Sequence, residues 1–303
     1  MNRWTVTINS FKMVAALLFM TGVFAHQAKA DETPFGYIYT TDSLPKGKWE
    51  YEQWHTVRTG KPQGTYTSLD ILNEAEYGFT DTFSCSFYLH SSLLHTHNAL
   101  NPDNTTETLD NQTNFDVNGV SLELKKRLLS PYKDPIGLTV YIEPELGVRS
   151  ALTGEDTIER AIEFKLIFDK HFFDDKLILA SNIVFEPEWE REGEERDKEL
   201  KNEYSIGGAY RFAPGWFGGV ELLNRRKFAR QSFGRQDASA WFLGPSVHYG
   251  TTGWWTTLTV LPQITGNPRS LGLDANGNEV SDGSKTLGEY EKMEIRWRIG
   301  INF

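Results

Sequence analysis

The chain has 303 residues, a formal net charge of −10, a mean hydropathy of −0.46 and a single cysteine. The acidic balance argues against a nucleic-acid partner, and one cysteine excludes an internal disulfide. The low hydropathy is typical of a soluble protein, but transmembrane strands that alternate polar and apolar residues give the same average.

Residues 1–30 predict a cleaved export signal. Arg3 and Lys12 form a basic n-region, 13–25 is an apolar run too short to span a bilayer, and Ala28-Lys29-Ala30 is an A-x-A cleavage site. The alternative, an uncleaved anchor, is disfavoured because Gly22 interrupts the run. Cleavage removes three of the 31 basic residues and none of the 41 acidic ones, which leaves a net charge of −13.

After a segment at 31–47, which we expect to lie in the periplasm, strand-like stretches recur to the end of the chain. They carry aromatic and β-branched residues at every second position, and their number is even, as bacterial barrels require. The charged stretch 188–201 has almost no apolar face, so we expect a solvated loop there rather than a helix. The predicted strands are 48–58, 67–78, 83–92, 115–127, 136–146, 159–168, 176–186, 201–211, 216–225, 238–249, 254–264 and 288–303.

The connections alternate between long polar segments and tight turns, as in barrels with external loops and periplasmic turns. Aromatic residues flank each tight turn, for example Phe172-Phe173 and Trp254-Trp255, at the level where lipid headgroups favour amphipathic rings. The sequence therefore predicts that 48–303 is one all-β domain, a transmembrane antiparallel up-and-down β-barrel of about 12 strands. Both termini are expected in the periplasm.

The last strand carries a predicted assembly signal. Met293, Ile295, Trp297, Ile299, Ile301 and the terminal Phe303 share one face, and charged residues with Gly300 occupy the other. A closing strand that ends on an aromatic residue resembles the signal read by the barrel assembly machinery, which is then an expected partner during biogenesis.

If the face of Phe303 meets lipid, the opposite parity of each strand lines the lumen. Placing a Lys or Arg in hydrocarbon near the bilayer midplane costs roughly 2–4 kcal/mol of stability. The strand positions that carry charged residues must therefore face protein or water. Carboxylates outnumber cations there, which would favour cations in an open pore. A packed interior of mutually neutralising charges is the open alternative. The lumen candidates are Glu50, Glu52, Glu74, Glu76, Glu123, Glu143, Glu145, Glu163, Lys165, Glu221, Arg225, Glu294, Arg296 and Arg298.

Motifs for catalysis or metal binding are weak. His90-Ser91 is an adjacent base and nucleophile without a glycine-rich elbow, and His95 and His97 lack a further fixed metal ligand. We therefore expect no enzyme activity, no cofactor and no metal site.

Several stretches resemble a family of proteobacterial exported proteins of about 300 residues that are regarded as outer-membrane barrels. These stretches are PFGYIYTT (34–41), LPKGKW (44–49), EYGFTD (76–81), SPYKDP (130–135), EPEWE (186–190), YRFAP (210–214) and LGP (243–245). The turn around Gly78 also resembles that of barrels proposed to pass small organic molecules. The resemblance covers most of the mature chain and implies a fold, with no functional residue to transfer.

The sequence thus predicts a protein of the Gram-negative outer membrane, embedded in its lipid after Sec-type export. The first functional hypothesis is a passive channel for small polar or cationic solutes. The second is a packed structural or interaction barrel without conductance, and the third is a hydrolase or lipid-modifying barrel with its site at one rim.

Overall fold

The computed structural model describes residues 33–100, 108–234, 236–267, 270–273, 279–281 and 283–303; the predicted export signal lies outside them. No helix among these residues is long and apolar enough to cross a membrane. The strands are β1 Trp49–Thr59, β2 Thr65–Thr80, β3 Phe83–His97, β4 Gln112–Leu129, β5 Gly137–Arg149, β6 Asp156–Phe172, β7 Leu177–Glu192, β8 Glu195–Ala213, β9 Trp216–Ala229, β10 Gln236–Gly250, β11 Trp254–Gly266, β12 Ser270–Leu273, β13 Glu279–Ser281 and β14 Met293–Asn302.

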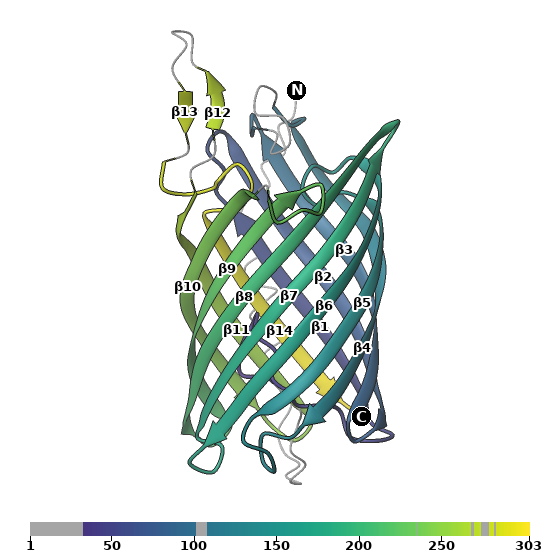
Figure 1. The fold of residues 1–303 in the computed structure, drawn as a ribbon, viewed down its shortest axis with the longest axis vertical. Coiled ribbons are helices and arrows are strands. Elements are labelled where there is room, and N and C mark those ends of the chain that lie inside the picture. The colour runs from purple at the N-terminus through teal and green to yellow at the C-terminus, as the bar shows by residue number, and fades with distance from the viewer. Residues whose placement is uncertain (1–32, 101–107, 235, 268–269, 274–278, 282) are drawn as a thin grey trace, which may run out of the picture.

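β1–β11 and β14 pair antiparallel with their neighbours and close into a barrel, which confirms the predicted 12-stranded architecture (Figure 1). The closing seam joins β1 to β14 with Tyr51 opposite Ile301. The Phe303 N–H donates a hydrogen bond of 2.8 Å to the Trp49 carbonyl and extends that seam to the last residue. β12 and β13 form a separate two-stranded sheet in the connection between β11 and β14.

The two ends of the barrel differ. The C-terminus lies at one end, here called the turn end, with the connections 81–82, 130–136, 173–176, 214–215 and 251–253. The opposite end, here called the loop end, carries the described residues of the other connections, at 60–64, 98–100, 108–111, 150–155, 193–194, 230–234 and 283–292. Which end faces the periplasm stays a prediction.

The loop predicted within 187–200 is wrong. β7 and β8 continue through it and meet in a tight turn at Gly193, whose φ of 55° suits glycine. Ladder hydrogen bonds hold the two strands together as far as Glu192 and Glu195. The stretch has almost no apolar residues at every second position, so its sequence gave no strand signal.

Alternate residues along the strands face opposite environments. On β6, Phe164 and Leu166 are 44% and 39% exposed on the outside, whereas Lys165 between them is 8% exposed and faces the interior. The same alternation places apolar side chains outside and charged ones inside around the barrel. This is the arrangement expected of a barrel solvated by hydrocarbon.

Residues 33–46, here called the N-terminal segment, do not lie outside the barrel as expected for 31–47. They run in the interior, where Phe35 and Ile38 have no exposed surface and pack on Ile178, Ala180 and Ala209 of the wall. The segment adopts no regular secondary structure. Its backbone groups must therefore be satisfied by the wall.

Candidate functional site: the lumen and the segment that closes it

The predicted lumen residues all occupy inward-facing positions. Most are buried, and four keep partial exposure: Glu145, Glu163, Arg225 and Arg296. Three groups form: Glu50, Glu52, Glu74, Glu76, Glu123 and Arg298 on β1–β4 and β14; Arg225, Glu294 and Arg296 on β9 and β14; Glu143, Glu145, Glu163 and Lys165 on β5 and β6. Glu221 stands apart from these groups and holds the N-terminal segment. The part that any of them plays in selectivity stays a prediction.

Wall side chains bind the backbone of the N-terminal segment, and Glu221, Asn182 and Asp169 make the bonds to its N–H groups inside the lumen. The Glu221 carboxylate accepts hydrogen bonds from the N–H groups of Gly36 and Tyr37, each of 2.8 Å. The Asn182 amide accepts from the Tyr39 N–H at 2.8 Å and donates to the Tyr39 carbonyl at 2.9 Å. These side chains supply the partners that a neighbouring strand supplies in a sheet.

The third anchor is Asp169 near the turn end of β6. Its carboxylate accepts hydrogen bonds from the Thr41 N–H at 3.0 Å and the Thr41 hydroxyl at 2.7 Å. Further towards the turn end, Asp81 accepts from the Lys46 N–H at 3.1 Å. The anchors thus follow the segment from the mouth of the turn end into the lumen.

Gly36 passes the wall more closely than any other residue type allows. A Cβ atom at this position would lie 2.5 Å from the Thr259 Oγ1 and 2.7 Å from the Thr259 Cβ. The Thr259 hydroxyl also donates to Glu221 at 2.8 Å, which fixes the carboxylate that binds the segment. Glycine is therefore needed for this close approach of two backbones.

The aromatic side chains of the N-terminal segment fill the lumen between cations of opposite walls. The Arg296 guanidinium lies 3.8 Å from the ring centre of Tyr37, and the Lys165 ammonium lies 3.9 Å from that of Tyr39. The Tyr39 ring also contacts Trp54 of β1 and Tyr141 of β5, with ring centres 6.2 Å and 5.7 Å away. Together these rings form a layer across the barrel at the depth of the segment.

Next to this layer the inward carboxyl groups of Glu52, Glu74 and Glu76 are buried. A cavity of about 20 Å³ lies there between the segment and the wall, about the room that one water needs. Its lining includes the ion pairs of Glu52 with Arg298 at 2.7 Å and of Glu76 with Lys125 at 3.2 Å. The N-terminal segment and these ion pairs therefore occupy the turn-end half of the lumen.

Towards the loop end, inward-facing charges keep contact with solvent. The side chains of Arg58, Lys201 and Glu203 are 31%, 43% and 20% exposed although they point into the barrel. Glu163 and Glu186 are each 17% exposed on the facing surface of β6 and β7. Water thus reaches the lumen from this end as far as the aromatic layer.

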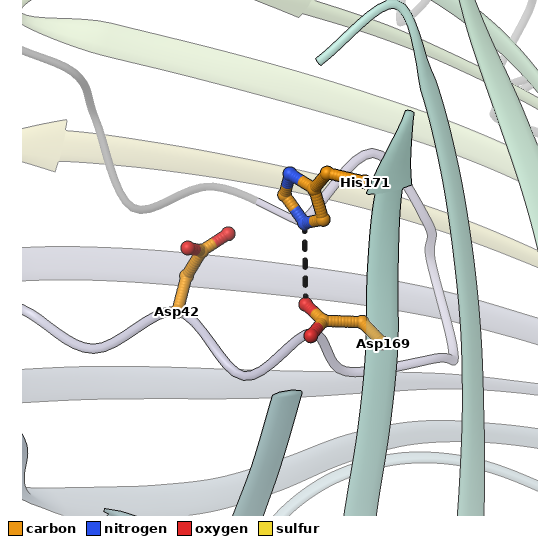
Figure 2. Close-up of side chains that lie close together, drawn as sticks. All are labelled: Asp42, Asp169 and His171. Carbon is orange, nitrogen blue, oxygen red and sulfur yellow. Dashed lines mark hydrogen bonds and ion pairs between the residues drawn. The ribbon is translucent and has the colours of Figure 1, made fainter. Parts of the chain in front are cut away.

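Asp42, Asp169 and His171 bring three possible metal-ligand atoms within 4.8 Å of one another (Figure 2). Asp42 comes from the N-terminal segment and the other two from β6. The two ring nitrogens of His171 already contact Asp169 at 3.3 Å and Asp175 at 3.0 Å, and Asp169 holds Thr41. Burial, and then the Asp169 carboxylate, raise the pKa of the Asp42 carboxyl. The arrangement fits an ion-pair network better than a metal site.

Sequence reasoning missed the anchors Asn182 and Asp169 and the ligand-like group at His171. Nothing in the strand pattern distinguishes an inward residue that binds the segment from one that meets water. The one signal that could have revealed the buried segment is the run PFGYIYTT (34–41), which is too apolar for an exposed linker.

Comparisons with known proteins agree with this fold. The model of a family of unknown function, DUF6662, matches residues 27–303. The outer membrane channel COG4313 from Pseudomonas putida F1 superposes with a TM-score of 0.55 at 12% identity, covering 87% of this chain and 98% of that one. The NanC porin and the KdgM porin each match at 12% identity over 84% of this chain and 98% of theirs, with TM-scores of 0.44 and 0.40. No curated protein matches.

Proposed function

We propose, for a chain that belongs to the DUF6662 family and shares the fold of outer-membrane channels, a passive channel for small polar or cationic solutes that its N-terminal segment closes. The observation that carries the proposal is that the N-terminal segment takes no part in the strand pairing that closes the barrel. The barrel closes through β1 and β14 without the segment, and side chains rather than strand pairing hold the segment inside. Displacing it leaves the sheet intact.

The charges that water already reaches favour cations. Glu145, Glu159, Glu163 and Glu186 face the lumen from three adjacent strands, β5, β6 and β7. Lys165 of β6 binds Glu163 at 2.8 Å, and Lys201 of the next strand, β8, binds Glu186 at 3.4 Å. Carboxylates remain in excess, and a ring segment of carboxylates raises the local concentration of cations.

Planar-bilayer recordings test the proposal. We expect rare openings from the refolded mature protein and frequent, cation-selective openings from a variant that begins at residue 44. Glu163→Gln in that shortened background should lower the preference for cations, because it removes a carboxylate that solvent reaches. A shortened barrel that folds, as judged by its heat-sensitive gel mobility, yet never conducts would refute a channel.

The second candidate, a packed barrel without conductance, is favoured by the burial of the N-terminal segment and by the small remaining cavity. The same recordings separate the two. A rim hydrolase is a weaker proposal, because His90 binds Ser121 at 2.8 Å rather than the adjacent Ser91.

A further inference from the structure

Four cations project from the outer face of the barrel at the loop end of β6, β7 and β8. Arg160, Arg191, Arg196 and Lys198 are all exposed. Arg160 of β6 is in register with Trp189 of β7, which is in register with Lys198 of β8. One row nearer the loop end, Ile158, Arg191 and Arg196 are in register in the same way. We call these four cations and Trp189 the basic block; Figure 1 shows its three strands side by side.

The basic block lies on the side of the wall that faces lipid. Its neighbours on that side are apolar and exposed, with Leu146 at 57% and Ile158 at 50%. Residues of the opposite parity at the same level, including Glu159 and Glu188, face the interior. Towards the middle of the strands the outer face continues with Phe164 and Ile206. The block therefore marks the upper border of the apolar band.

The cations are gathered rather than scattered. In the loop-end half of β1–β5, the described outward positions carry no Lys or Arg, although the whole chain has 31 of them. Neither Arg160 nor Lys198 has an ion-pair partner among the described residues. Cations at the border of the hydrocarbon are favourable where anionic headgroups neutralise them, and a tryptophan prefers the same level.

The spacing specifies the anion further. The backbones of Arg160 and Lys198 are two strand separations apart, about 10 Å, with Trp189 on the strand between them, so the two cations leave room for one phosphate each. A headgroup with two phosphates can contact both, with Trp189 between them. We infer that the basic block binds the two phosphates of a lipid A headgroup in the leaflet at the loop end.

This inference rests on the lipid-facing exterior assumed in the proposed function and is independent of conduction. The test uses the refolded mature protein in mild detergent with bisphosphorylated lipid A, and retained lipid is read by native mass spectrometry. The double variant Arg160→Gln/Lys198→Gln should bind about thirtyfold more weakly, because each of the two surface cations near lipid contributes about 1 kcal/mol.

The matched control is Lys48→Gln/Lys126→Gln, which removes two exposed cations at the turn end and should bind as the wild type does. Lipid A stripped of its phosphates should bind weakly to the wild type, a comparison that needs no variant to fold. Equal retention by the double variant and the wild type, or equal binding of the stripped lipid, would overturn the inference. If the barrel binds lipid A but never conducts, the channel proposal is refuted and the lipid A site is supported.

Discussion

At the scale of single residues, Glu221 is the group on which the seating of the N-terminal segment depends most. Its buried carboxylate accepts from Gly36, Tyr37 and Thr259. Hydrogen bonds to a charged acceptor contribute roughly 1.5–3 kcal/mol each, so losing them should shift the segment towards an unseated state.

Glu221→Leu should therefore expose the segment while the barrel stays folded. The measurement is the rate at which a water-soluble maleimide labels a Thr40→Cys reporter in a Cys85→Ser background. We expect labelling at least about a hundredfold faster, the factor that corresponds to two lost bonds of about 1.5 kcal/mol each. Glu159→Gln changes an inward carboxylate away from the segment and should leave the rate unchanged; an unaltered rate in Glu221→Leu would contradict the anchoring role.

Gly36 offers a second test, with a rescue built in. Gly36→Ala places a methyl group against Thr259 and should speed labelling of the same reporter. Adding Thr259→Gly removes the obstructing atoms and should restore part of the protection. If the double variant labels no more slowly than Gly36→Ala, steric contact with Thr259 is not the reason for glycine at this position.

At the scale of elements, the ends of the twelve barrel strands were predictable to within six residues because a period of two survives in single sequences. The lumen parity followed from the same period, so Glu123 and Glu143 were placed correctly on the inner face. The path of residues 33–46 was not predictable, because an extended segment with no periodicity leaves no sign of which wall side chains will bind it. The prediction of a loop between β7 and β8 failed for a related reason, because charged residues are typical both of a loop and of a solvated hairpin.

The end of β14 carries the assembly-signal prediction. Trp297, Ile301 and Phe303 are exposed on the outer face, whereas Gly300 packs against the Trp255 ring. Deleting Phe303 removes two seam hydrogen bonds with the Trp49 backbone and the terminal ring. We expect much less assembled barrel in the outer-membrane fraction of cells but a similar urea midpoint for protein refolded in vitro. A large loss of stability in vitro would instead make Phe303 a structural residue.

At the scale of the whole molecule, the central claim is that hydrocarbon surrounds the barrel. Ile206 on β8 is 57% exposed near the middle of the outer face, and Phe212 is 60% exposed near the turn end. Ile206→Arg should cost roughly 2–4 kcal/mol of unfolding free energy in lipid vesicles, against roughly 0–1 kcal/mol for Phe212→Arg at the border. Urea unfolding measures both, and equal costs would indicate that no depth-dependent apolar medium surrounds the strands.

The way the wall binds the N-terminal segment bears on which substitutions the segment tolerates. Glu221, Asn182 and Asp169 contact peptide groups, which every amino acid carries, so these contacts constrain few side chains. The constrained positions are those set by packing or by a side-chain hydrogen bond, namely Phe35, Gly36, Tyr37, Ile38, Tyr39 and Thr41. A detached peptide that keeps these six residues should then fill the lumen of a truncated barrel, whatever residues stand at its other positions.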